Sequence, residues 1–252
     1  MEDIQEKKYD VLVIGAGAAG MRAAIAASDE GASVCLVSKS LLGKAHTVMA
    51  EGGAAAALGN ADERDNWKVH FRDTIKGGKH LNNWKMAKIH AEQAPERILE
   101  LERWGAVFDR TKDGKINQRN FGGHRYPRLA HVGDRTGLEI IRTVQDKVIH
   151  QDNIDIFMEC TVATIITEDN QAVGALAYYR NNGEIVAIHA KAIVVATGGI
   201  GKAYRVTSNS WEYTGDGHSL AYLACASFSI NSYSPHHVVC SGSNFHWFLS
   251  NV

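Results

Sequence analysis

Residues 9–38 contain the feature that most restricts the fold, a glycine-rich turn between two apolar runs. The run over residues 11–14 predicts a buried parallel strand, and the turn at residues 15–20 follows it directly. That turn fits the pattern G-x-G-x-x-G and opens an alanine-rich helix, which we expect to end near Glu30. A second strand is predicted over residues 32–37. This order and spacing are typical of the βαβ unit that binds dinucleotides.

Each glycine of this turn has a separate expected role. Gly15 makes the tight turn, Gly17 lets the backbone approach a pyrophosphate, and Gly20 lets the helix pack closely on the strand. The N–H groups and the dipole at the start of the helix favour an anion at this position. The predicted cofactor contacts are therefore the residues of the turn, Gly15, Ala16, Gly17, Ala18, Ala19 and Gly20.

The end of the second predicted strand departs from the usual dinucleotide pattern. Ser38 and Lys39 stand where an acidic residue normally binds the ribose of NAD. A serine hydroxyl can still bond to a ribose, but the departure argues against NAD as the cofactor.

A second glycine-rich strand end lies about 180 residues downstream. The apolar run over residues 192–196 predicts a buried strand, which Thr197, Gly198 and Gly199 follow. Asp216 lies further on, between two glycines, and has two interpretations. It is either the N-cap of a helix after ordinary turns, or a second contact with the same dinucleotide. Two such strand ends favour a long cofactor, such as FAD.

Composition excludes several classes of function. A net charge of -1 over 252 residues gives no electrostatic reason to expect nucleic-acid binding. The four cysteines are widely spaced without a C-x-x-C pair, which argues against a disulfide framework, a zinc site and a disulfide oxidoreductase. The charged N-terminal segment is typical of neither a secretory signal nor a transit peptide. No apolar run approaches the ~20 residues that span a bilayer, so we expect any membrane association to go through a partner.

The rest of the chain completes a predicted α/β fold. Residues 84–104 show helical spacing, and we expect Pro95 to divide them into two short helices. Residues 136–150 predict a further helix. Residues 155–190 predict a β-meander with a hairpin turn at residues 181–183. We therefore expect a Rossmann-type, three-layer FAD-binding fold with this meander inserted into it.

Several motifs show a resemblance to a known family. They are GAGAAG at residues 15–20, SKSLLGKAHTVMAEGG at 38–53, NFGG at 120–123, GDRTG at 133–137, ATGG at 196–199 and TGDG at 214–217. Over about residues 9–224 the chain resembles the flavoprotein subunit of succinate dehydrogenase and fumarate reductase. Residues 65–84 and 206–213 are similar to a bacterial branch of that family.

The resemblance implies that His46 carries the cofactor covalently. In that family, the histidine of the H-T-V-x-A-x-G-G loop is bonded through a ring nitrogen to the 8α-methyl group of FAD, and the small residues around it let the loop wrap the flavin. A structural histidine is the alternative, and a metal ligand is disfavoured because no ligand cluster surrounds His46. The FAD contacts implied beyond the first turn are Ser38, Lys39, Ser40, Gly43, Lys44, Ala45, His46, Thr47, Ala50, Glu51, Gly52, Gly53, Ala196, Thr197, Gly198 and Asp216.

The same resemblance implies a dicarboxylate pocket at Phe121 and Gly52. In the family, the phenylalanine presses on the substrate, and the backbone at Glu51 and Gly52 donates to a carboxylate. An ordinary glycine loop is the alternative for residues 121–123. Four arginines occur nearby, and we expect each to be a solvated or cofactor-side charge rather than a substrate clamp: Arg119, Arg125, Arg128 and Arg135.

Residues 225–252 differ from the rest of the chain in composition. They hold no Asp, Glu, Lys or Arg, where about six or seven would be expected at ordinary composition. The family continues here with a capping domain that supplies an arginine acid/base, and no residue of this chain matches that arginine. We therefore expect an FAD-binding domain over residues 1–224 and a truncated or out-of-frame tail, with the capping domain absent and no certain catalytic residue. His236, His237 and His246 have no metal-site pattern, so no metal ligand is assigned.

The function implied by the resemblance is oxidation of succinate to fumarate, or the reverse reaction, by covalently bound FAD. The implied partners are an iron–sulfur protein, membrane anchor subunits with quinone, an FAD assembly factor and a dicarboxylate substrate. The chain would then lie peripherally on the cytoplasmic side of the bacterial inner membrane, and we expect the fragment alone to be inactive. Two alternatives stay open. One is another member of the superfamily, such as L-aspartate oxidase, against which His46 argues, and the other is a non-catalytic FAD-binding fragment.

Overall fold

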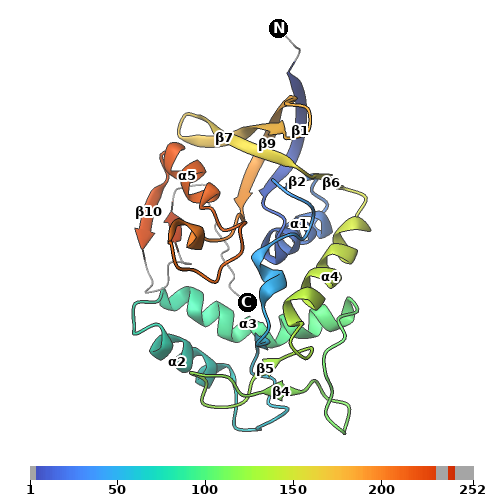
Figure 1. The fold of residues 1–252 in the computed structure, drawn as a ribbon, viewed down its shortest axis with the longest axis vertical. Helices are drawn as coiled ribbons and strands as arrows, with labels where there is room; N and C mark the ends of the chain where they lie inside the picture. The colour runs from blue at the N-terminus through green and yellow to red at the C-terminus, as the bar shows by residue number, and fades with distance from the viewer. Residues whose placement is uncertain (1–3, 231–237, 242–252) are drawn as a thin grey trace. The chain divides into compact units, whose positions relative to one another are not determined.

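The chain folds into two units (Figure 1). The structure, a computed structural model, describes residues 4–230 and 238–241. Of these, the first unit comprises residues 4–46, 144–230 and 238–241, and the second comprises residues 47–143.

A six-stranded sheet forms the centre of the first unit. Its order is β6-β2-β1-β9-β8-β7, with the bounds β1 (Gln5–Ile14), β2 (Val34–Val37), β6 (Ile154–Phe157), β7 (Cys160–Glu168), β8 (Gln171–Tyr179) and β9 (Ile185–Val195). The first four strands in this order run parallel, while β8 and β7 extend the sheet in antiparallel pairing. The helix α1 (Ala18–Asp29) packs against β1 and β2. The βαβ unit expected over residues 9–38 is therefore confirmed, inside a mixed sheet.

The strand β9 joins the parallel and antiparallel parts of this sheet. It pairs with β1 along one edge and with β8 along the other. The hairpin turn predicted at residues 181–183 is confirmed, because it connects β8 to β9 and Gly183 has the positive φ (76°) that favours glycine. The predicted meander thus continues the central sheet.

The core of the sheet is apolar, as the runs in the sequence indicate. Leu12, Val13 and Ile14 are at most 4% exposed, and β2 is buried over its whole length. After β9 the first unit contains the short helices η2 (Gly201–Ala203) and α5 (Asp216–Leu223) and the antiparallel pair β10 (Ser227–Ile230) and β11 (Val238–Ser241). The tail histidines His236, His237 and His246 fall outside the described residues.

Helices and a small antiparallel sheet form the second unit. Its elements are β3 (Ala54–Ala55), α2 (Trp67–Gly77), α3 (Trp84–Arg103), β4 (Gln118–Arg119) and β5 (Leu129–Ala130), in the sheet order β3-β5-β4. The 3₁₀ helix η1 (His46–Met49) leads the chain into this unit, and α4 (Thr136–Ile149) leads it out again. The helix expected over residues 136–150 is therefore confirmed. Ile98, Phe108 and Ile116 belong to the apolar core of the unit.

The prediction of two short helices over residues 84–104 is wrong, because α3 is one helix with Pro95 in its interior. A proline there costs about 3 kcal/mol, since it lacks the N–H donor and crowds the preceding turn. Two features offset this cost. Ala87, Ala91 and Ile98 are buried on one side of the helix, before and after the proline. The Asn83 side chain caps the N-terminus by accepting from two backbone N–H groups.

A buried histidine lies on the inner side of α2. His70 is 1% exposed, and its ring lies 5.1 Å from that of His90 and 5.9 Å from that of His124, measured between centroids. Burial lowers the pKa of His70 to about 3, and the nearby histidines and Arg128 act in the same direction. Within the described residues, no group of three His, Cys, Asp or Glu side chains could hold a metal ion. His70 is therefore neutral in the folded protein at neutral pH.

We expect His70 to make the second unit sensitive to acid. Its pKa is lower in the folded state than the ordinary value of about 6.5, so below that pH the unfolded state binds a proton that the folded state does not. The free energy of unfolding should then fall by up to ~1.4 kcal/mol per pH unit as pH drops from about 6.5 toward 3. Urea titrations at several pH values should show a shallower fall in His70→Gln. His150→Gln, which changes an exposed histidine, should keep the wild-type slope; equal slopes in all three proteins would contradict the prediction.

Candidate functional site

The first glycine turn touches the second glycine-rich strand end. Gly15 has a φ of 109°, and a Cβ atom built on it would lie 2.4 Å from the carbonyl oxygen of Ala196. A Cβ atom on Gly20 would lie 1.8 Å from the carbonyl oxygen of Gly15. Only glycine fits at these two positions, because any side chain would push α1 away from the ends of β1 and β9.

The start of α1 has the properties of an anion site. Gly17 is its N-cap residue, and no side chain caps the first turn. The N–H groups of that turn have no partners within the helix and carry the positive end of its dipole. A glycine turn of this shape at the start of a helix fits the pyrophosphate of a dinucleotide.

Lys39 and Asp216 join two more of the predicted cofactor segments. The Lys39 ammonium group lies 2.6 Å from an Asp216 carboxylate oxygen and donates to the Thr214 hydroxyl at 2.6 Å. The backbone N–H of Gly217 donates to the Thr197 hydroxyl at 3.0 Å. Gly215 is the N-cap of α5 and Asp216 its first helical residue, so the N-cap interpretation of Asp216 is wrong.

His46 is held by a segment to which sequence analysis assigned no role. The Ser210 backbone N–H donates to Nδ1 of His46 at 3.1 Å, and Nδ2 of Asn209 lies 3.5 Å from its Nε2. The ring of Tyr213 lies 4.5 Å from the imidazole, and burial raises the pKa of Tyr213. A Cβ atom on Gly198 would lie 2.5 Å from the Tyr213 ring, so that glycine makes room for it. In the sequence, only the resemblance of residues 206–213 to a bacterial branch pointed to this segment.

The remaining cofactor positions divide between the units. In the first unit, Ser38 and Ser40 are buried just after the end of β2. The Gly43 N–H donates to the Ala16 carbonyl at 3.2 Å. The loop that carries Lys44 and Ala45 therefore starts beside the first glycine turn. Thr47, Ala50, Glu51, Gly52 and Gly53 belong to the second unit. There the Ala50 N–H donates to the Thr47 carbonyl at 3.1 Å, which closes a turn.

The two predicted substrate residues are neighbours in the second unit. A Cβ atom built on Gly52 would lie 3.4 Å from the ring of Phe121, which is 58% exposed. Gly53 follows with a φ of 120° and lies close to the carbonyl oxygen of Ala130. An exposed aromatic ring beside a glycine backbone is a surface on which a small planar molecule can pack.

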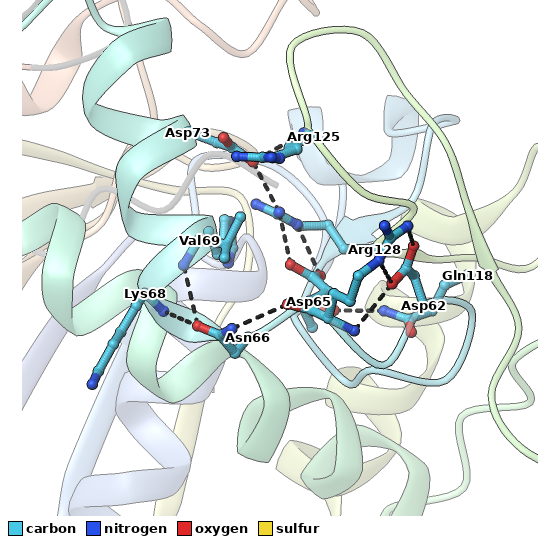
Figure 2. Close-up of polar contacts among 12 residues, drawn as sticks. Asp62, Asp65, Asn66, Lys68, Val69, Asp73, Gln118, Arg125 and Arg128 are labelled. Carbon is cyan, nitrogen blue, oxygen red and sulfur yellow. Dashed lines mark hydrogen bonds and ion pairs between the residues drawn. The ribbon is translucent and has the colours of Figure 1, made fainter.

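The four nearby arginines have different environments. Arg125 and Arg135 are exposed, as expected for solvated charges. For Arg128 that expectation is wrong, because its side chain is completely buried between Asp65 and Asp73, with N–O distances of 2.8 and 2.9 Å (Figure 2). Both carboxylates come from residues before β4, far from Arg128 in sequence. Charge compensation by two carboxylates is what allows a guanidinium group to be buried, and sequence proximity alone could not indicate it.

Arg119 also differs from the solvated arginines. Its side chain is 31% exposed and reaches the backbone of the loop that contains Glu51 and Gly52.

Comparison with known proteins identifies the family. Residues 10–240 match a family described as FAD binding domain, so the chain belongs to it. The chain is 57% identical to Sdh1 of Mycobacterium smegmatis, solved in complex with UQ1, over 89% of this chain and 39% of that one, with a TM-score of 0.86. It is 38% identical to the fumarate reductase flavoprotein subunit of Haemophilus influenzae, over 87% of this chain and 36% of that protein. It is 37% identical to the succinate dehydrogenase flavoprotein subunit of Rickettsia conorii, over 88% of this chain and 38% of that protein.

These matches confirm the α/β FAD-binding fold and the resemblance to succinate dehydrogenase and fumarate reductase flavoproteins. The chain spans a little under two fifths of the length of these relatives. The family match continues beyond residue 225, where the composition of the tail changes. In the part of the chain that the structure describes, no helix is both long and apolar enough to cross a membrane.

We expect Gly20→Ala to abolish FAD binding. The added methyl group would lie 1.8 Å from the Gly15 carbonyl oxygen, so α1 must shift away from the turn that shapes the anion site. Such overpacking typically costs about 1–3 kcal/mol of stability. Flavin absorbance after gel filtration and the thermal midpoint measure the two effects. Gly77→Ala is the matched control, because a Cβ atom there meets nothing within 4 Å; a Gly20→Ala protein that keeps its flavin would contradict the assignment.

Proposed function

We propose that this chain is the FAD-binding part of a succinate dehydrogenase or fumarate reductase flavoprotein subunit. The observation that carries the proposal is the meeting, in the first unit, of the uncapped glycine turn at α1 with the Lys39–Asp216 pair and the segment around His46. These positions are the ones that the motifs shared with that family predict, and the 57% identity to Sdh1 extends over 89% of the chain.

The residues fit FAD as follows. The N–H groups at the start of α1 would hold the pyrophosphate, because Gly15 and Gly20 keep side chains out of the turn. Ser38 and Lys39 would lie near the ribose of FAD. Asp216 would make a second contact with the same FAD molecule. FAD would supply the acceptor for a hydride, that is, for a hydrogen with its pair of electrons, which no side chain can provide.

His46 would hold the flavin covalently. The Ser210 N–H donates to Nδ1 at 3.1 Å, whereas Asn209 is 3.5 Å from Nε2, so we assign the bond to the 8α-methyl carbon to the more weakly engaged Nε2. The ring of Tyr213 limits rotation of the imidazole by packing at 4.5 Å. The segment at residues 209–213 is thus a positioning element for His46.

The second unit would contribute to the dicarboxylate site. The backbone at Gly52 would donate to a substrate carboxylate, and the exposed ring of Phe121 would pack against the carbon chain. Oxidation of succinate removes a hydride from one methylene carbon and a proton from the other, and leaves the double bond of fumarate. We assign no residue of the described chain to the proton transfer.

The partners follow from the same assignment. The electrons would pass first to an iron–sulfur subunit, then to quinone held by membrane anchor subunits, while an FAD assembly factor would assist formation of the His46 bond. The chain would lie peripherally at the cytoplasmic side of the bacterial inner membrane.

In the whole flavoprotein subunit of which we propose this chain to be a part, we expect FAD to survive denaturation, because a C–N bond does not depend on the folded structure, whereas noncovalent binding does. On a denaturing gel in acid, the protein band should fluoresce under ultraviolet light. His46→Ala should give a dark band while the folded protein still retains flavin on gel filtration. His150→Ala, at an exposed position just after α4, should fluoresce as the wild type does. Fluorescence that persists in His46→Ala would refute the assignment.

The activity is tested on the whole flavoprotein subunit of which we propose this chain to be the FAD-binding part, loaded with FAD and assembled with its partner subunits. Succinate should reduce an artificial dye, and malonate should inhibit competitively, because it presents two carboxylates without the ethylene group that is oxidised. L-Aspartate should not be oxidised. Dye reduction by L-aspartate, with a dark gel band for the wild type, would favour the L-aspartate oxidase alternative.

A further inference from the structure

We infer that Arg119 is a positioning residue that orients two backbone N–H groups, those of Gly52 and Gly53, toward a substrate carboxylate. The inference rests on the proposed dicarboxylate site and identifies what holds its backbone donors in place. Arg119 itself does not face the substrate in this arrangement, because its guanidinium group binds the carbonyl side of the loop and the N–H groups lie on the opposite side.

The guanidinium group binds two consecutive carbonyl groups. Nε of Arg119 donates to the Gly52 carbonyl oxygen at 2.6 Å, and Nη2 donates to the carbonyl oxygen of Glu51. Nη1 lies 3.1 Å from a carboxylate oxygen of Asp134, which is largely exposed. All three nitrogens of the fork therefore have partners, and two of them hold the same loop.

Peptide geometry converts these contacts into an orientation of donors. The Glu51 carbonyl shares a planar peptide with the Gly52 N–H, and the Gly52 carbonyl shares one with the Gly53 N–H. In a trans peptide the two groups point in opposite directions, so both N–H groups point away from Arg119. Among the residues that the structure describes, none accepts a hydrogen bond from the backbone N–H of Glu51, Gly52 or Gly53. These donors are thus oriented and have no partner in that part of the chain.

The positive charge strengthens the same donors. A cation that binds a carbonyl oxygen polarises the peptide, which makes its N–H a better donor. The Arg119 charge lies behind the loop, where it also attracts an anion on the other side. Lysine could supply the charge but not the planar fork that binds two carbonyls at once.

The surrounding contacts fix the loop in this conformation. The Ala50 carbonyl accepts from the Gly137 N–H at 2.7 Å. Gln118, the neighbour of Arg119 on β4, donates to the Ala56 carbonyl at 2.6 Å and accepts from the Asn60 N–H at 2.9 Å. Gly53 has a φ of 120°, which side chains rarely allow. Phe121 follows on the same segment and its ring lies beside Gly52, so one segment holds the donors and supplies the adjacent ring.

The test measures malonate binding to the FAD-loaded protein, assembled with its partners, through the change in flavin absorbance. Arg119→Gln should weaken malonate binding about 10- to 100-fold, as expected for the loss of one or two oriented hydrogen bonds to a charged group. The malonate affinity of Arg119→Lys should lie between that of Arg119→Gln and that of the wild type. With succinate as substrate, the KM should rise by a similar factor and kcat should change less. Arg97→Gln removes a positive charge at an exposed position of α3, and it should bind malonate as the wild type does.

Hydrogen exchange gives a second readout that a merely structural role would not move. Malonate should slow exchange of the Gly52 and Gly53 amides in the wild type and have less effect in Arg119→Gln. Wild-type malonate binding in Arg119→Gln would overturn the inference while leaving the proposed function intact. If Arg119→Gln fails to fold, the malonate affinity of Arg119→Lys tests the inference instead. Wild-type affinity in that variant would overturn the role of the planar guanidinium group. A wild-type protein that binds no dicarboxylate would overturn both the inference and the proposed function.

Discussion

The close approach of α1 to the end of β1 is the contact on which the first unit depends. It exists because Gly20 has no side chain, so the helix backbone can pass directly over the Gly15 carbonyl. Gly15 in turn lies against the backbone of Ala196, at the end of β9. A single methyl group at either position would separate the helix from two parallel strands. The same contact sets the helix N-terminus beside the strand ends, which is where parallel α/β sheets bind their ligands.

In the second unit, a buried group of charged side chains is a further constraint on the backbone. Arg128 is removed from water completely, and Asp65 and Asp73 compensate its charge. Removal of one member of such a group typically costs about 3–5 kcal/mol, because the remaining charges stay buried without a partner. The group therefore connects the start of α2, its middle and the segment before β5. Gln118 and Arg119 on β4 bind backbone carbonyls on either side of β3, those of Ala56 and of Glu51 and Gly52.

Arg119 and Arg128, which lie close together in sequence, thus have different structural roles. Arg128 satisfies carboxylates in the interior, whereas Arg119 satisfies backbone carbonyls near the surface. The difference decides which groups remain for a ligand. Two of the Arg128 nitrogens, Nε and Nη2, bind buried carboxylates. At the loop around Gly52, Arg119 binds the carbonyl groups and the N–H groups point away from it.

Local sequence pattern determined the βαβ unit, the hairpin at residues 181–183 and the helix α4, because each depends on apolar periodicity and glycine within one short segment. The continuity of α3 through Pro95 was decided by burial on both sides of the proline, which propensity cannot show. Glycine motifs and a shared loop pattern were enough to point to FAD and to His46. The Ser210 and Tyr213 contacts of His46, the carboxylates around Arg128 and the carbonyls bound by Arg119 come from segments far away in sequence. Only the tertiary structure could decide these, because a hydrogen bond or an ion pair depends on distance in space and leaves no periodic trace in the chain.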